Sequence, residues 1–127
     1  MADEIQIQTK LYATKGGAYL PSQTTSKTLD MAGTDMGSAT QSVATSDAAL
    51  SIPASVTGDR WVEINSLEPE GGNYIELSTA TGGSFAASIF GKITAAGTFF
   101  GMIPSAVTWY AKANTAAVLV DIRACEK

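Results

Sequence analysis

The sequence predicts an all-β protein, namely a small antiparallel β-sandwich of the jelly-roll type that forms a single domain over residues 1–127. Three observations favour this fold class. Several segments alternate apolar and polar residues with a period of two, as half-buried strands do. From Arg60 onward, turn signals recur about every 8–12 residues, a spacing typical of sandwiches and barrels. No stretch of helical length repeats its apolar residues with a period near 3.6.

The first predicted element is an N-terminal strand within residues 3–13. Its apolar residues Ile5 and Ile7 share one face of the strand, and the polar residues that alternate with them share the other. The segment Lys15-Gly16-Gly17 then predicts a turn, because glycine adopts backbone angles that other residues avoid. We expect residues 1–20 to act as an arm that can reach a neighbouring subunit.

Residues 16–58 are expected to form a loop-rich segment. They are rich in Ser, Thr, Ala and Gly, and residues 31–58 carry only two charged side chains, Asp35 and Asp47. Disordered segments combine high net charge with little apolar content, so we favour long loops that lie on neighbouring elements over disorder. The segments expected to form short strands are residues 27–31, 42–44 and 49–52.

Residues 60–126 are expected to hold the regular strands of the sandwich. The turns between these strands are marked by glycine, proline, asparagine and serine, which favour turn conformations. The predicted strands are residues 60–67, 74–78, 85–93, 98–103, 108–112 and 117–124. The predicted turns and connections are residues 68–72, 80–83, 94–97, 104–105 and 113–115.

Composition excludes several functional classes. The chain contains no histidine, which rules out a Ser-His-Asp triad, a Cys-His dyad and imidazole ligation of zinc or haem. With 8 basic and 12 acidic residues the net charge is −4, which argues against nucleic acid or an anionic membrane as a partner. No apolar run approaches the roughly 18 residues of a membrane-spanning helix, and the acidic N-terminal residues oppose a secretory signal. We therefore expect synthesis in a reducing cytoplasm.

The remaining polar motifs are interpreted as structural. Glu68 and Glu70 flank a proline and could form an acid–base pair, but a solvated turn is the better interpretation of this segment. No segment has the spacing of a calcium-binding loop, although a calcium site assembled from distant loops stays open as an alternative. Cys125 is the single cysteine, so it is interpreted as a bystander thiol. We therefore predict no catalytic, cofactor-binding or metal-binding residue and no enzymatic activity.

Two aromatic doublets, at residues 99–100 and 109–110, are the candidate interaction residues. Adjacent residues of a strand point to opposite faces, so one member of each doublet faces away from the core. Over residues 77–111 the only charged side chain is Lys92, and small neutral side chains fill the polar positions. Such surfaces permit close contact between subunits without burying unpaired charges, which predicts a homo-oligomer such as a trimer. The candidate interface residues are Phe99, Phe100, Trp109 and Tyr110.

Three groups of residues in the second half form a recurring β-hairpin pattern. They are residues 61–67 (WVEINSL) with 73–77 (NYIEL), residues 90–93 (FGKI) with 97–100 (GTFF), and residues 109–117 (WYAKANTAA), which lead into the last strand. Over residues 60–126 this pattern resembles small structural proteins of tailed-bacteriophage virions. The resemblance implies a capsid decoration (cement) or minor capsid protein that binds itself and the major capsid protein. It also implies that the protein resides in the virion after synthesis in the host cytoplasm.

Two other functions stay open. A tail-tube, tail-associated or neck-associated subunit would share the composition but would stack into open-ended polymers or other rings. A carbohydrate-binding module would instead present a planar row of exposed aromatic side chains for stacking on sugar rings. On the sequence, the residues of such a row would be Trp61, Tyr74 and Trp109.

Overall fold

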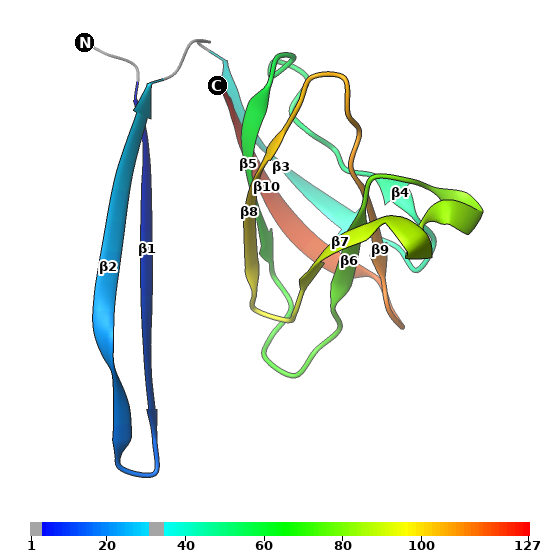
Figure 1. Ribbon diagram of the computed structural model, residues 1–127. Helices are drawn as coiled ribbons and strands as arrows, with labels where there is room; N and C mark the ends of the chain where they lie inside the picture. The colour runs from blue at the N-terminus through cyan, green and yellow to red at the C-terminus, as the bar shows by residue number, and fades with distance from the viewer. Residues whose placement is uncertain (1–3, 31–34) are drawn as a thin grey trace. The chain divides into compact units, whose positions relative to one another are not determined.

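The computed structural model describes residues 4–30 and 35–127, and Figure 1 shows that strands make up nearly all of its regular secondary structure. The predicted all-β class is therefore confirmed. The chain divides into two compact units, residues 1–32 and 33–127, where the sequence predicted one sandwich over residues 1–127. The first unit is a two-stranded hairpin, and the second holds two four-stranded antiparallel sheets that form the predicted sandwich.

The hairpin consists of β1 (Glu4–Lys15) and β2 (Ala18–Asp30), which pair antiparallel from Glu4 opposite Asp30 to Lys15 opposite Ala18. Gly16 and Gly17 form the turn with φ of 57° and 84°. Positive φ at both central residues is the geometry of the tight turns that match the twist of paired strands. The turn predicted at these glycines is confirmed.

The loop-rich segment predicted over residues 16–58 is wrong for residues 18–30, which form one continuous strand. These residues lack a clear period-two pattern, and their strand conformation follows from the tight turn that places them opposite β1. The outermost residues of two predicted strands, 3 and 31, lie outside the described residues.

The sandwich consists of one sheet in the order β3-β10-β5-β8 and a second in the order β4-β9-β6-β7. Two short 3₁₀ helices, η1 (Gly82–Ser84) and η2 (Ala86–Ser88), lie between β6 and β7. The chain crosses between the sheets repeatedly, so that β8 and β10 belong to the first sheet and β9, between them in sequence, to the second. The strands are β3 (Met36–Val43), β4 (Ala48–Ala49), β5 (Arg60–Ser66), β6 (Ile75–Ser78), β7 (Ile89–Ile93), β8 (Thr98–Ile103), β9 (Tyr110–Ala113) and β10 (Val118–Glu126).

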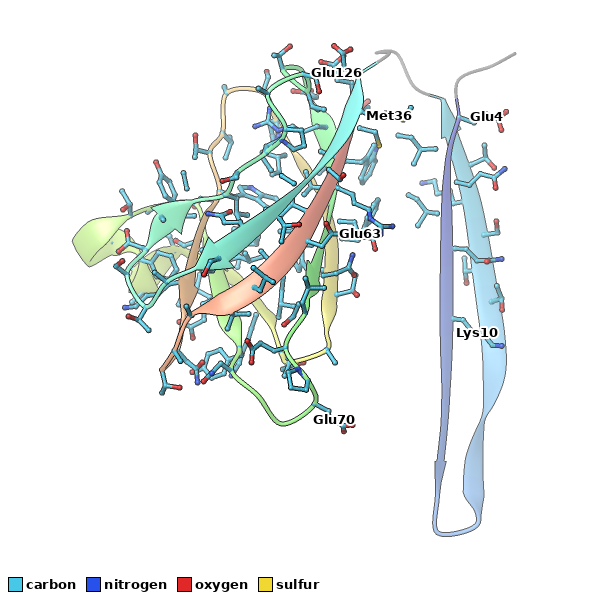
Figure 2. The ribbon with its side chains drawn as sticks, turned by 180° about the vertical axis from the view of Figure 1, so that it is seen from behind. Glu4, Lys10, Met36, Glu63, Glu70 and Glu126 are labelled. Carbon is cyan, nitrogen blue, oxygen red and sulfur yellow. The ribbon has the colours of Figure 1, made fainter. Side chains whose placement is uncertain are left out.

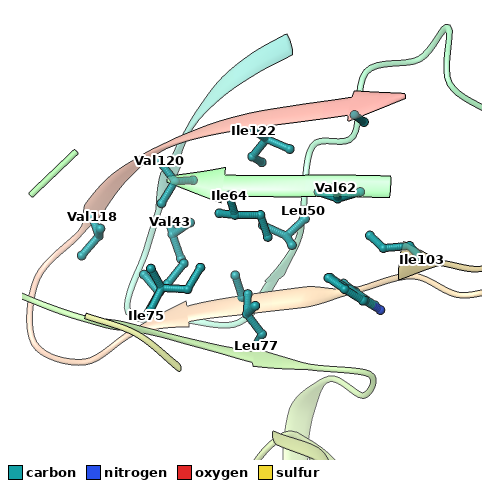
Figure 3. Packing of buried hydrophobic residues seen from close by; sticks show 14 of the residues in the cluster. Val43, Leu50, Val62, Ile64, Ile75, Leu77, Ile103, Val118, Val120 and Ile122 are labelled. Carbon is teal, nitrogen blue, oxygen red and sulfur yellow. The ribbon is translucent and has the colours of Figure 1, made fainter. Parts of the chain in front are cut away.

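The core lies between the two sheets and follows from the period-two patterns (Figure 3). Alternate residues of β5 and β10 point inward, and each fully buried valine or isoleucine among them contributes about 1.5–3 kcal/mol. Leu50 and Val56 also belong to the core, so the loop after β4 packs on the sandwich as expected. The fully buried side chains include Val62, Ile64, Ile75, Leu77, Ile103, Val118, Val120 and Ile122.

Within the sandwich, three strands differ from the sequence prediction by more than two residues at one end. The strand expected at residues 42–44 begins at Met36, and the one expected at 49–52 is reduced to Ala48–Ala49. The strand expected over 85–93 starts at Ile89, because residues 86–88 form η2. There the carbonyl of Phe85 accepts a hydrogen bond from the buried Ser78 hydroxyl at 3.1 Å, which holds the helical turn against β6.

Candidate functional site

The two aromatic doublets each divide between the core and the surface, as the alternation predicts. Trp109 is buried with 8% of its surface exposed, and Phe99 packs against the core. Phe100 is 41% exposed and Tyr110 is half-buried. Of the four candidate interface residues, Phe100 therefore presents the most accessible ring, and Trp109 is a core residue.

Phe99 and Trp109 form an aromatic cluster with Phe90, which is itself 41% exposed and which the sequence prediction did not single out. The ring centroids of Phe90 and Trp109 lie 4.7 Å apart, and those of Phe99 and Trp109 lie 5.7 Å apart. Gly91 and Gly101 leave space for these rings, since a Cβ on Gly101 would lie 2.9 Å from atoms of both Phe99 and Trp109. The cluster lies where β7 of one sheet is followed in the chain by β8 of the other.

The outer face of the β3-β10-β5-β8 sheet carries an apolar strip, defined here as Met36, Cys125, Trp61, Met102 and Phe100. The first four come from the four strands in turn and stand in register with one another across the sheet. Met36 is 67% exposed and lies at the start of β3, as Figure 2 shows. The rings of Trp61 and Phe100 stack with their centroids 5.3 Å apart and an interplanar angle of 6°.

A polar band borders the apolar strip on the same face. Its members bind one another, since Arg123 Nε lies 3.2 Å from Asp121 Oδ2 and Asn65 Nδ2 donates to Glu63 Oε1 at 2.8 Å. The hydroxyl of Thr98 in turn donates to Asn65 Oδ1 at 2.6 Å. Each charged residue of this band thus has a polar partner on the same face, and the strip beside it is apolar.

Sequence reasoning missed the apolar strip, because its members are far apart in the chain. Met36, Trp61, Met102 and Cys125 become neighbours only through the register of three strand pairs. The signal that could have found them is the alternation of β5 and β8, which places Trp61 and Met102 on the outward face. Burial in the strip raises the pKa of the Cys125 thiol, which fits the interpretation of this residue as unreactive.

The outer face of the second sheet is charged instead of apolar. Glu76 stands in register between Lys92 and Lys112, and the Lys92 ammonium lies 3.5 Å from the centroid of the Tyr74 ring. Tyr74 is therefore covered by a lysine, Trp61 lies in the other sheet, and Trp109 is in the core. The planar row expected for a carbohydrate-binding module is not formed by these three residues.

Two carboxylates, here called the loop clamps, accept hydrogen bonds that join segments distant in the sequence. Glu126 Oε1 accepts the backbone N–H of Gly58 at 2.8 Å and that of Thr57 at 3.1 Å, and these bonds lower the pKa of Glu126. Asp47 accepts the hydroxyl of Thr81 and the N–H of Gly82, which lower the pKa of Asp47 in the same way. Both carboxylates are thus engaged with the backbone, which is a structural use.

The other acidic residues do not converge on a site. Glu70 lies on the loop after β5 and is exposed (Figure 2). Within residues 4–30 and 35–127, no group of three or more Cys, Asp and Glu side chains is placed to hold a metal ion.

Strand β1 of the hairpin alternates in exposure along its first residues. Ile5 and Ile7 are half-buried, whereas Gln6 and Gln8 between and after them are exposed. The hairpin forms a two-stranded sheet by itself. A two-stranded sheet alone is marginally stable in water, and a further layer packed on it adds stability.

No helix within the described residues is long and apolar enough to cross a membrane. Comparisons with protein-family models, curated proteins and solved structures found no match to this chain.

Proposed function

We propose that this chain is a non-enzymatic structural protein of a tailed-bacteriophage virion. Its role would be that of a capsid decoration or minor capsid protein that binds itself and the major capsid protein. The observation that carries the proposal is the hairpin, in which β1 alternates half-buried isoleucines with exposed glutamines. Its strands of 12 and 13 residues form a sheet with no second layer in their own unit. A hairpin of this length is stabilised when its apolar side is covered by another subunit.

The isoleucines of β1 supply the driving force for such a contact. Each Ile side chain contributes about 1.5–3 kcal/mol when it passes from water to a fully buried position. Ile5 and Ile7 are only half-buried in the hairpin, so part of this free energy is still available for binding. The glutamines at positions 6 and 8 are exposed and suit the side of the hairpin that stays in solvent.

The apolar strip supports a second contact. Methionine side chains adapt their shape to a partner, and tryptophan is enriched among residues that dominate binding free energies. On this face Met102 stands beside Trp61 of the stacked pair Trp61–Phe100, and Met36 lies at the other end of the strip, beyond Cys125. In the neighbouring polar band Arg123 pairs with Asp121, and Glu63 accepts a hydrogen bond from Asn65. Partners within the sheet reduce the cost of covering the strip.

The test uses two matched double variants of the full chain. Ile5→Glu with Ile7→Glu adds two negative charges to the apolar side of β1, and Gln6→Glu with Gln8→Glu adds the same charge to the exposed side. Co-sedimentation with particles assembled from the major capsid protein of the same genome measures binding, and light scattering measures the mass of the free protein.

We expect the isoleucine variant to lose particle binding and the glutamine variant to keep it. Equal binding by both variants would remove the hairpin as the contact. If the free protein instead grows without limit as its concentration rises, the tail-type alternative, an open-ended stack, replaces the capsid proposal.

A further inference from the structure

Strand β3 leaves an open edge on the four-stranded sheet. It lies at the end of the order β3-β10-β5-β8 and pairs with β10 through an unbroken register of eight residues, Met36–Val43. The strand contains no charged residue and no proline, and its register with β10 has no bulge. Proteins use those three features to protect edge strands from pairing with other chains, so an edge without them is a template for strand addition.

The pairing with β10 fixes which backbone groups face this open edge. The N–H of Glu126 donates to the carbonyl of Asp35 at 2.9 Å, and the N–H of Leu67 donates to the carbonyl of Leu119 at 2.9 Å. Because hydrogen-bonding direction alternates along an antiparallel strand, the odd-numbered residues of β3 bond to β10. The even-numbered residues direct their N–H and C=O groups outward, and they are Met36, Ser38, Thr40 and Ser42.

The other edges of the sandwich are less suited to strand addition. β4 is two residues long, and β7 carries Lys92. β8 has six residues, and the ring of Phe90 from β7 lies edge-on against Phe99 of that strand. By contrast, the loop after β4 contacts β3 through a side chain, since the Ser51 N–H donates to the Gln41 side chain at 2.9 Å. This contact does not use the outward backbone groups of β3.

We infer that β3 is a self-association edge, which pairs antiparallel with β3 of a second copy of this chain about a two-fold axis at Ala39. In this register Met36 lies opposite Ser42 of the second copy, and Ser38 lies opposite Thr40. All four outward residues of each copy then find partners, giving about eight backbone hydrogen bonds. The strand is uncharged, so the symmetric pairing places no like charges opposite each other.

This inference rests on the proposed assembly function and names one contact of that assembly. The occupant is a second copy because one register satisfies every outward backbone group with an identical strand. The strands of the hairpin fit this edge less well, since β1 carries Glu4 and Lys10 and β2 carries Lys27 and a proline.

The test places charges at positions 38 and 40 of the full chain, where both side chains are exposed. In the variant Ser38→Glu/Thr40→Glu, the introduced carboxylates face one another across the two-fold axis. In the matched variant Ser38→Glu/Thr40→Lys, each carboxylate faces an ammonium group. Within one copy, position 38 neighbours Arg123 and position 40 neighbours Asp121, so the second variant is also compatible with β10. Circular dichroism checks that each variant is folded.

Sedimentation equilibrium gives the dimerisation constant of each protein. We expect the Glu/Glu variant to dimerise roughly two- to thirtyfold more weakly than the wild type, and the Glu/Lys variant to match or exceed the wild type. Ser38→Lys/Thr40→Lys should also dimerise weakly, and mixing it with the Glu/Glu variant should restore a dimer of mixed composition.

Three results would overturn the inference: a wild-type protein that is monomeric at every concentration, equal dimerisation of the Glu/Glu and Glu/Lys variants, or no mixed dimer. A monomer that still binds capsid particles through the hairpin would overturn only the β3 contact and leave the proposed function standing. If Ile5→Glu/Ile7→Glu loses particle binding but still dimerises, the hairpin binds the particle and β3 forms the dimer independently of it.

Discussion

Gly101 sits between two aromatic rings, and replacing it with alanine tests how tightly the aromatic cluster is packed. The added Cβ would lie 2.9 Å from Phe99 Cε1 and 2.9 Å from Trp109 Cη2, whereas ordinary contacts begin near 3.4 Å. Both rings must therefore shift by about half an ångström within a packed core, and overpacking of this kind costs about 1–3 kcal/mol. Alanine has less conformational freedom than glycine in the unfolded chain, and this difference offsets about 0.4–1 kcal/mol of that cost. We expect Gly101→Ala to lower the free energy of unfolding by about 1–2 kcal/mol.

Urea denaturation monitored by circular dichroism measures this change, and Gly83→Ala is the matched control. A Cβ on Gly83 meets nothing within 4 Å, so this variant should be as stable as the wild type or slightly more stable. In Phe99→Leu/Gly101→Ala the smaller side chain gives the new methyl group room, so the two changes together should cost less than their sum. If Gly101→Ala and Gly83→Ala have the same stability, the packing argument for the aromatic cluster is refuted.

Further predictions concern β10 and the loop clamps. The Ile122 side chain has no exposed surface, so Ile122→Ala should lower the free energy of unfolding by about 2–5 kcal/mol. Leu119 lies on the same strand but is 45% exposed, so Leu119→Ala should cost well under half as much in the same urea assay. The pKa of Glu126 is lowered in the folded protein, so its stabilising effect is present above the ordinary value of 4.5 and is lost as the pH falls through the lowered folded pKa. Glu126→Gln should therefore be less stable than the wild type at pH 7, and the difference should shrink in acid; a difference that is constant from pH 7 to pH 2 would contradict this assignment. The same sign holds for Asp47, whose pKa is also lowered, and Asp47→Asn should lose its difference from the wild type over a similar acidic range.

The strands of the second half were predictable because their information is local. The turn signals on either side of residues 98–103, Gly97 before them and Pro104 after them, predicted a strand with the same bounds as β8. Local patterns do not predict the start of β7, because it depends on the burial of Phe85 in the folded chain. Phe85 is buried, and the segment after it turns as η2 before β7 begins.

The hairpin and the apolar strip could not be predicted in full, because both depend on pairings between distant residues. β2 is rich in serine and threonine and has little apolar alternation, so its strand conformation is a consequence of pairing with β1. The strip depends on which residue of β5 stands opposite which residue of β10 and β8. A shift of that register by one residue would turn Trp61 toward the core and remove the strip.

The bond between the Asp35 carbonyl and the Glu126 N–H has a mechanical consequence. A pulling force transmitted along the chain from the hairpin enters the sandwich at β3, beside the last residues of β10. If the molecule is held at Lys127, the two grips act on the same end of neighbouring antiparallel strands. The hydrogen bonds between them are then loaded one after another, as in a zipper, and each breaks at low force. Gripping the chain at Lys127 and beyond Val43 instead loads the same ladder in shear, where all its bonds share the tension.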